Sequence, residues 1–336
     1  MGKLNSLQVL RFVAALGVVW EHASTQANPH HLTGGAAGVD LFFVLSGFVI
    51  ARAAQTRPDR FLCDRLTRIF PTYWLWSITW LVLGGWPMPL DGWQLFTTGT
   101  LLPSPTATPL ASYVGGGWTL SFELMFYTAV WLVLRGLPLR VLAVAYGALA
   151  TASIVSQSAL LHFVGSPMVI EFVLGLLAYH LGRGRPILGA TCLAVACAAF
   201  PFLPKQLSLP QAALTPLLGL GRVALLGPLA FLTVWGAAQF DCSSRVWRPL
   251  VVLGDASYSV YLSNLLLIKL SVGFLGSHFG PAALAATSVG LGLLTYLLLE
   301  RPLLRLTRRS VSAPGPVPQP EMAYAGSSEQ QHPGCR

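Results

Sequence analysis

Charged side chains are scarce in this sequence, and acidic ones are the scarcest. Only 10% of the 336 residues are charged, with 12 Asp and Glu against 21 Lys and Arg. An average soluble domain contains about 25% charged residues, so the deficit excludes an ordinary water-soluble domain. Hydrophobic residues make up 54% of the chain. The composition therefore predicts an all-α polytopic membrane protein.

Cysteine is also rare and has no recognisable spacing. The five cysteines are Cys63, Cys192, Cys197, Cys242 and Cys335. They match neither metal-ligand spacing nor a secreted disulfide framework, so we interpret them as packing residues and expect no metal site and no bound cofactor. No small-residue cleavage site follows the first apolar segment, which we therefore expect to stay in the membrane as a span.

Long apolar runs are abundant and recur from one end of the chain to the other. Runs of about 17 to 25 apolar residues are long enough to cross a hydrocarbon core of roughly 30 Å, and we count about ten of them. The predicted spans lie at 4–23, 36–56, 70–87, 118–135, 139–157, 165–183, 186–203, 222–240, 254–276 and 280–301.

The formal net charge of +9 follows the predicted topology. Nearly all Lys and Arg fall in segments on one side of the membrane; only Lys205 and Arg222 fall in loops on the other side, and Arg11 and Lys269 fall within spans. By the positive-inside rule, this asymmetry predicts that the N- and C-termini are both cytoplasmic. The basic charge then needs no nucleic-acid partner.

The last segment of the chain changes in composition. Residues 310–336 are rich in Pro, Ser and Gln, which is typical of a disordered tail, here cytoplasmic, whereas residues 1–309 form the predicted membrane domain. The longest outside loop, at 87–117, is rich in Pro, Thr and Gly and could form a lid or a re-entrant element.

Ionisable side chains inside a span normally face the interior of the bundle and mark a site. In "LRFVAALGVVWEHA", Arg11 and His22 are eleven positions apart, which places them on one helix face about 16 Å apart along the axis. Spacing alone leaves two interpretations open: two points of an internal face, or two side chains reaching the two membrane interfaces. Glu21 points about 100° away from that face.

The second span opens with an acidic residue in "GVDLFFVLSGFVI". An unpaired carboxylate at this position, Asp40, should find a cation or become protonated, and His22 lies close by across the short first loop. Ser46 and Gly47 follow in the same span. Because small residues let helices approach closely, we interpret this pair as packing.

Two arginines lie in the inside loop "RFLCDRLTRIFPTYW". Arg65 and Arg68 are spaced i, i+3, and Pro71 is predicted to begin the third span. Arginine binds phosphate oxygens through two parallel hydrogen bonds, so the pair suits a phosphorylated ligand. The alternative is an ordinary pair of positive-inside anchors.

An acid lies within the fourth span, in "GGGWTLSFELMFY". Glu123 is close along the helix to Trp118, Ser121 and Tyr127. A buried Glu can act as an acid or base or orient a histidine, or it can be the structural partner of a buried arginine. For the later polar residues we favour packing or pairing; these are Glu171, Asp255, Ser257, Tyr258 and Glu300.

Six separated blocks together resemble the integral-membrane acyltransferase family 3. They are "LQVLRFVAALGVVWEHA", "GVDLFFVLSGFVI", "RLTRIFPTYWL", "WTLSFELMFY", "GDASYSVYLSN" and "ERP". The resemblance covers the chain to about residue 305 and is strongest with the exopolysaccharide-production branch of the family. It implies an enzyme of the bacterial inner membrane that moves an acyl group, most often acetyl, from acyl-CoA to a hydroxyl of a carbohydrate or lipid-linked glycan.

The resemblance also implies roles for particular residues. His22 matches the essential histidine of the family, Arg11 its partner arginine, and Glu123 the acid of the fourth block. Arg65 and Arg68 match the basic pair. The chain departs from the family at Asn264, where a histidine is common and a proton-transfer role is therefore lost or moved, and at Leu124, where a second glutamate is more common.

We therefore expect His22 to act as general base on a sugar hydroxyl, with Glu123 or Asp40 fixing its tautomer. Arg11, Arg65 and Arg68 are expected to bind acyl-CoA as a co-substrate. The expected support residues are Trp118, Ser121, Tyr127, Ser257 and Tyr258. The competing class is a transporter or flippase that uses buried Arg, His and Glu as a relay, which predicts internal repeats and broken helices.

Overall fold

The protein is described by a computed structural model covering residues 4–28, 31, 33–83, 91–106, 112–205, 215–275 and 280–305. Every regular element in these ranges is a helix, which confirms the all-α prediction. The α-helices of the first half are α1 (Asn5–Ala27), α2 (Gly38–Thr56), α3 (Phe61–Leu83), α4 (Gly92–Thr100), α5 (Gly117–Leu134) and α6 (Leu139–Val155). Those of the second half are α7 (Ala159–Val164), α8 (Val169–His180), α9 (Pro186–Ala199), α11 (Pro216–Ala238), α12 (Arg248–Asp255), α13 (Ser257–Leu275) and α14 (Pro281–Thr295).

Four single turns complete the description. They are the 3-10 turns η1 (Gly35–Ala37), η2 (Phe200–Phe202) and η4 (Arg245–Trp247), and the π-helical turn η5 (Tyr296–Glu300) that continues α14. Single π-helical turns inside α-helices are frequent at functional sites.

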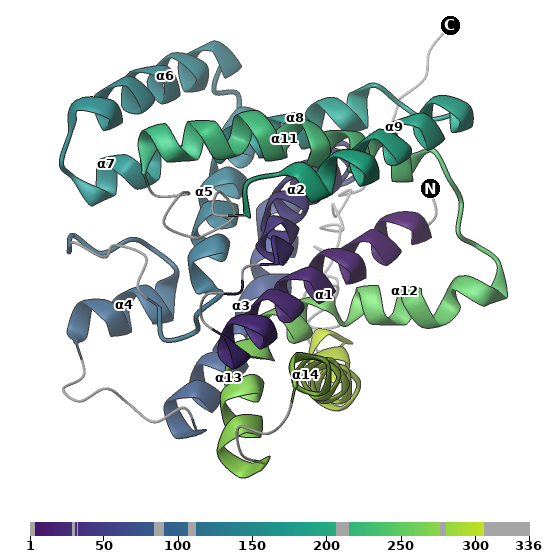
Figure 1. The fold of residues 1–336 in the computed structure, drawn as a ribbon. Helices are drawn as coiled ribbons and strands as arrows, with labels where there is room; N and C mark the ends of the chain where they lie inside the picture. The colour runs from purple at the N-terminus through teal and green to yellow at the C-terminus, as the bar shows by residue number, and fades with distance from the viewer. Residues whose placement is uncertain are drawn as a thin grey trace, which may run out of the picture.

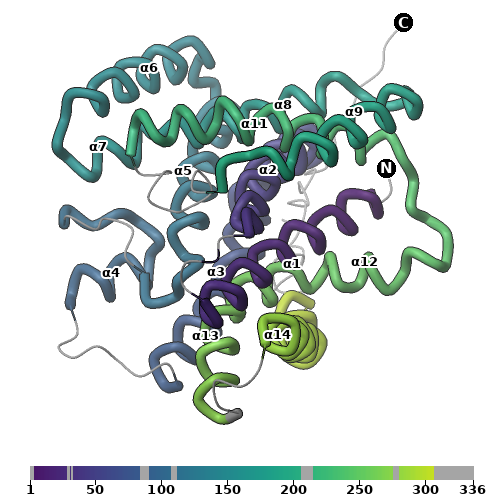
Figure 2. Tube along the Cα trace, viewed as in Figure 1, coloured from purple at the N-terminus to yellow at the C-terminus, as the bar shows by residue number. Residues whose placement is uncertain are grey.

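Helix α1 lies at the centre of the arrangement. It crosses the middle of the view in Figure 1 and contacts α2 and α11 on one side and α12, α13 and α14 on the other. Helix α14, viewed almost end-on in Figure 2, packs beside α13 and α1. Helix α4 lies at the periphery. The residues of α1 therefore face different partners on opposite sides of the helix.

The helices support a multi-pass membrane protein. Five described helices are long and apolar enough to span a bilayer, and α12 with α13, bent by 56° at their junction, make a sixth candidate. Each predicted span contains a helix, but α1 and α3 are not among these candidates, and α6 and α9 have only 17 and 14 residues. The number of ten spans and the cytoplasmic placement of both termini remain predictions. The predicted tail at 310–336 lies outside the described residues.

Two helices begin earlier than the spans predicted for them. Helix α3 begins at Phe61, so Pro71 lies inside the helix and Arg65 and Arg68 belong to its first turns. Helix α11 begins at Pro216, so Arg222 is a buried helical residue and not part of an outside loop. Hydropathy places a span boundary at a charged residue, whereas a charge that is paired can continue inside the helix.

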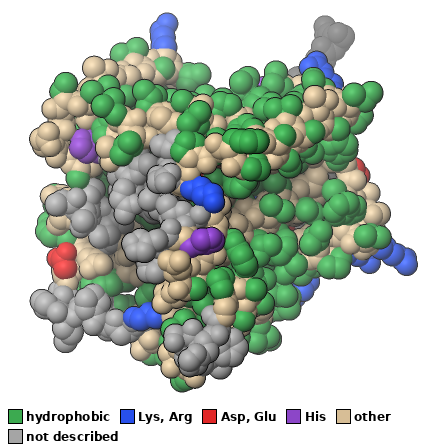
Figure 3. Space-filling view, viewed as in Figure 1, with side chains coloured by type: hydrophobic (Ala, Val, Ile, Leu, Met, Phe, Trp, Pro, Cys, Tyr) green, Lys and Arg blue, Asp and Glu red, His purple; other side chains and the backbone are tan. Residues whose placement is uncertain are grey.

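Large apolar side chains face outward on many helices. Val82, Val144, Ile187 and Phe274 are 73–85% exposed. The face of the molecule in Figure 3 is mostly hydrophobic, with few charged side chains. Exposed apolar surface of this extent is expected where helices face lipid.

Helices α2 and α8 approach each other through glycines. A Cβ atom on Gly47 would meet the backbone of Phe172, and one on Gly175 would meet the backbone of Val44. The packing role predicted for Gly47 is confirmed, since only a residue without a side chain allows this approach. Ser46 has a different contact, described below.

The buried carboxylate Asp40 pairs with Arg222. Arg222 Nε donates to Asp40 Oδ1 and Arg222 Nη2 to Asp40 Oδ2, both at 2.8 Å, and the two side chains are 1% exposed or less. The cation expected for Asp40 is therefore an arginine of α11, and the expectation that His22 supplies it is wrong. The two-bond contact ties α2 to α11, and the carboxylate of Glu171 from α8 lies near enough to interact with both charges.

We expect removal of one partner of this pair to destabilise the protein strongly. Asp40→Ala or Arg222→Ala leaves an uncompensated buried charge, which costs about 3–5 kcal/mol. Thermal unfolding of the purified protein in detergent should show the loss.

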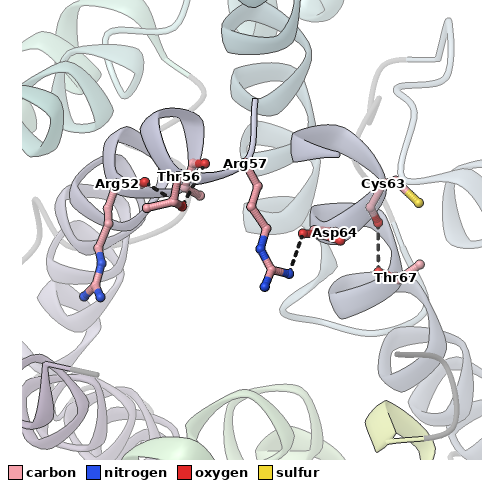
Figure 4. Close-up of polar contacts among 7 residues, drawn as sticks. Arg52, Thr56, Arg57, Cys63, Asp64 and Thr67 are labelled. Atoms are coloured by element: carbon pink, nitrogen blue, oxygen red, sulfur yellow. Dashed lines mark hydrogen bonds and ion pairs between the residues drawn. The ribbon is translucent and has the colours of Figure 1, made fainter. Parts of the chain in front are cut away.

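The control is a pair at the exposed turn between α2 and α3. Arg57 Nη1 lies 3.9 Å from Asp64 Oδ2, and the Arg57 side chain is 74% exposed (Figure 4). Asp64→Ala should change stability by less than about 1 kcal/mol. Equal losses from Asp40→Ala and Asp64→Ala would show that the Asp40 to Arg222 contact does not hold α2 against α11.

Candidate active site

Two polar side chains of α1 contact the same neighbouring helix. Arg11 Nε donates to Ser257 Oγ over 3.3 Å, and His22 Nδ1 lies 2.6 Å from Asn264 Oδ1. Ser257 and Asn264 are two turns apart on α13, so both contacts use one face of each helix. The internal-face interpretation is therefore correct, and neither side chain extends from the bundle as an interface anchor.

The Asn264 contact determines which nitrogen of His22 carries a proton. Asn264 Nδ2 donates to the carbonyl of Tyr261 at 2.5 Å, which fixes the orientation of the amide and leaves Oδ1 as the atom facing His22. Because Oδ1 can only accept, His22 Nδ1 must donate. A neutral imidazole then has an unprotonated Nε2, which is the form a general base requires.

The expectation that Glu123 or Asp40 fixes the tautomer of His22 is wrong. Asp40 is occupied by Arg222, and Glu123 Oε1 accepts a short hydrogen bond from Ser46 Oγ. The sequence marks Asn264 only as a departure from the family, which commonly has a histidine there. An amide cannot take a proton from the imidazole, but it can hold the ring, and this interhelical role has no signal in the spacing of the residues.

Glu21 is turned away from the His22 face, as the helical phase predicts. Its Oε2 accepts from Thr33 N at 3.0 Å, Gly35 N at 2.9 Å and the Thr33 hydroxyl. This carboxylate therefore holds the loop between α1 and α2 against the end of α1 that carries His22.

A narrow pocket lies between α1, α2, α3, α5 and α13. Its polar lining consists of Arg11, Ser46, Arg65, Arg68, Thr119, Glu123, Tyr127, Ser257, Tyr258 and Tyr261. The structure thus brings together the predicted acyl-CoA arginines, the predicted acid and three of the predicted support residues. Three guanidinium groups against one carboxylate favour an anionic ligand.

The pocket holds about 80 Å³, whereas a pocket for a whole drug-sized ligand is about 300–1,000 Å³. Only a slender part of a large ligand can enter it. Tyr258 closes one wall by donating to the Ile69 carbonyl at 3.1 Å, and the Tyr261 and Thr119 hydroxyls are hydrogen-bonded at 3.1 Å.

His22 does not line this pocket. The His22 partner Asn264 lies on α13 one turn beyond the lining residue Tyr261, about 4.5 Å further along the helix axis. Two predicted support residues also lie elsewhere: Trp118 packs edge-on against Phe43 and Phe122, and Ser121 is buried outside the lining.

Glu300 is a further acid near the arginines. It accepts from Ser259 Oγ at 2.6 Å and lies close enough to interact electrostatically with Arg11 and Arg68. The pairing role expected for this residue agrees with that position.

More basic side chains surround the turn that leads into α3. Arg52, near the end of α2, and Arg57, directly after it, extend in the same direction (Figure 4). Cys63 in the same region is a free thiol, as are Cys192, Cys197 and Cys242, and Cys335 lies outside the described residues. Within the described ranges, no three His, Cys, Asp or Glu side chains are placed to hold a metal ion.

Together, the fold and the site define a multi-pass membrane protein with a positively charged pocket beside a histidine of fixed tautomer. The sequence model for the acyltransferase domain of family 3 matches residues 4–300. The chain therefore belongs to this acyltransferase family and is an acyltransferase that transfers groups other than aminoacyl groups.

Two relatives are similar over most of the chain. One is the exopolysaccharide production protein ExoZ of Rhizobium meliloti, 35% identical over 87% of this chain and 96% of its own. Another is the acyltransferase MdmB of Streptomyces mycarofaciens, 27% identical over 96% of this chain and 97% of its own. No solved structure matches the chain. Membership of the family favours an enzyme over the transporter or flippase alternative.

We expect Asn264→Ala to lower kcat roughly a hundredfold, because general-base catalysis contributes about 10²–10⁴ and the imidazole would no longer be held in one tautomer. The KM for the acyl donor should change little, since Asn264 lies outside the pocket. Asn264→Asp keeps the acceptor that faces His22 but loses the donor to the Tyr261 carbonyl, so it should restore the rate only in part.

Ser263→Ala is the control. Ser263 is buried on the same helix, and its hydroxyl donates to the carbonyl of Val260 in that helix. Steady-state rates of the purified enzyme test this assignment. If Asn264→Ala and Ser263→Ala have the same kcat, Asn264 does not position His22.

Proposed function

We propose that the protein transfers an acyl group, most simply acetyl, from cytoplasmic acyl-CoA to a hydroxyl of a glycan at the bacterial inner membrane. The observation that carries this proposal is a pocket with three arginines in an acyltransferase, together with His22, whose Nδ1 faces Asn264 one turn of α13 beyond the lining residue Tyr261. The name of the relative ExoZ, an exopolysaccharide production protein, supports a glycan acceptor.

The donor is proposed to bind with its phosphates at the mouth of the pocket. Arg65 and Arg68 present two guanidiniums from adjacent turns of α3, and Arg11 adds a third from α1. Arginine binds phosphate through parallel hydrogen bonds, and the CoA nucleotide carries several phosphate groups. The narrow pocket admits the pantetheine arm, so the thioester travels toward Tyr261 while the nucleotide remains outside.

The transfer itself requires a base and a returned proton. His22 Nε2 takes the proton of the sugar hydroxyl as its oxygen attacks the thioester carbonyl. The tetrahedral intermediate collapses to the new ester and the CoA thiolate, which takes the proton from the imidazolium. Asn264 keeps Nδ1 protonated throughout, so no net proton is consumed.

The charge asymmetry supports a cytoplasmic position for the arginine end of the site. Arg11 lies toward the N-terminal end of α1, with Arg65 and Arg68 beside it, and His22 lies about 16 Å further along the helix. With the N-terminus inside, the donor enters from the cytoplasm and the acyl group reaches the outer half of the membrane at His22.

The first test follows labelled acetyl from acetyl-CoA to a glycan in membranes that contain the protein. We expect His22→Ala to lower the transfer by about 10²–10⁴ because the general base is lost. His180→Ala is the control, since His180 is exposed on α8 and bonds its own helix carbonyl at Leu176. Equal transfer by wild type and His22→Ala would refute the mechanism.

A second test examines the donor site. Arg65→Ala and Arg68→Ala should each raise the KM for acetyl-CoA about tenfold or more, because hydrogen bonds to charged groups contribute about 1.5–3 kcal/mol. Arg57→Ala, at the exposed turn, is the matched control.

Acetyl-dephospho-CoA, which lacks the 3'-phosphate, sharpens this second test. The wild type should have a higher KM for acetyl-dephospho-CoA than for acetyl-CoA. In the variant that lacks the arginine facing the 3'-phosphate, the two substrates should have similar KM values. A rise of the same size with Arg57→Ala would mean that the basic surface acts only through its net charge.

A further inference from the structure

The narrow pocket has a basic end and an apolar end. Its lining residues recur every four positions on two helices: Ile50, Ser46 and Phe42 on α2, and Tyr127, Glu123 and Thr119 on α5. Ser46 and Glu123 are hydrogen-bonded to each other, so the two helices are in register at this level. Tyr127 lies near enough to Arg65 to interact with it. Because four residues of helix rise about 6 Å, the pocket extends about 12 Å from this basic end to Thr119.

An aromatic pair closes the apolar end. The rings of Phe42 and Tyr261 meet edge-on with their centroids 5.7 Å apart. Apolar side chains of α2 and α5 supply the rest of the lining there, namely Val39, Phe43 and Leu120. If the arginines bind the phosphates of the donor, the apolar end receives the part farthest from the nucleotide, which is the acyl group.

The ring of Tyr261 is fixed on three sides. The Thr119 hydroxyl donates to the Gly116 carbonyl at 2.9 Å, so the Tyr261 hydroxyl is the donor in its 3.1 Å contact with Thr119. A Cβ atom on Gly116 would lie 2.8 Å from Cε1 of Tyr261, so the ring rests directly on this glycine. These contacts, together with the edge of Phe42, oppose a rotation of Tyr261 that would lengthen the pocket.

Phe42 lies between the pocket and the part of α1 that separates Arg11 from His22. It packs against the buried cluster around the pocket and also against a cluster of α1, α13 and α14 that includes Ala15 and Val19. Along α1, these two residues lie between Arg11 and His22. Loss of the Phe42 ring would therefore extend the pocket along α1 and leave the three arginines in place.

We propose that Phe42, backed by Tyr261, limits the donor to a short acyl group, so that the enzyme transfers acetyl and rejects longer chains. The inference rests on the proposed function and specifies its donor. The pocket holds about 80 Å³, so a longer acyl chain would have to displace Phe42 from both clusters that it joins. Overpacking of this kind is unfavourable because the interior has little free space.

The preference for acyl length is measured as kcat/KM for acetyl-, propanoyl-, butanoyl- and hexanoyl-CoA with one glycan acceptor. The wild type should lose about 10–200-fold for each added methylene, which is the usual discrimination of an apolar pocket. Phe42→Ala should raise the ratio of butanoyl to acetyl transfer at least tenfold. Phe42→Leu should give an intermediate ratio and tests the same inference if the alanine variant does not fold.

Phe231→Ala is the matched control. Phe231 is a half-buried phenylalanine of α11, as Phe42 is of α2, but it packs in a different cluster and does not line the pocket. Its substitution removes the same ring from the bundle and should leave the preference for acyl length unchanged. Thermal unfolding shows whether each variant is folded.

Binding tests the inference without turnover. The His22→Ala protein should bind acetyl-CoA more tightly than butanoyl-CoA in isothermal titration calorimetry, because Phe42 is still present. In the double variant His22→Ala/Phe42→Ala, the two donors should bind with similar affinity.

The outcomes separate this inference from the proposed function. An unchanged ratio of butanoyl to acetyl transfer in folded Phe42→Ala, or equal transfer of all four acyl groups by the wild type, would overturn the role of Phe42. Absence of transfer from any acyl-CoA by the wild type would refute the proposed function instead.

Discussion

The contact of α1 with α13 determines the geometry of the site. His22 bonds Asn264 and Arg11 bonds Ser257, so two polar pairs at different heights hold the two helices in one register. A shift of one residue would rotate α1 by about 100° and leave these polar groups unpaired in an apolar interior. The narrow pocket depends on that register, because Arg11 lines it from α1 while Ser257 and Tyr261 line it from α13.

Charged side chains inside the bundle differ in how completely they are paired. Arg222 is fully buried and bound through two hydrogen bonds to Asp40, while the arginines of the pocket are only partly paired by protein groups. Glu123 and Glu300 lie near Arg11, Arg65 and Arg68 but do not neutralise all three charges. The first arrangement holds two helices together, and the second leaves positive charge available to an anionic ligand.

Several features could be predicted because they depend on residues close in the sequence. Helical phase alone placed Arg11 and His22 on one face and turned Glu21 away, and the i, i+3 spacing of Arg65 and Arg68 put both in one pocket. Hydropathy located a helix in each predicted interval. It did not predict that α11 and α3 begin before Arg222 and Pro71, because a window average responds to the charge or the proline itself. Arg222 is stable inside its helix through the contact with Asp40.

The sequence by itself determined the class of protein, its family, and which polar side chains lie on the inner face of each helix. Only the tertiary structure decided their partners: Arg222 for Asp40, Asn264 for His22, Ser46 for Glu123, and the loop at Thr33 for Glu21. Helix periodicity is a local property, which determines only the direction of each side chain around the axis of its own helix. Pairing between helices depends on their relative height and rotation, which the packing of the whole bundle sets.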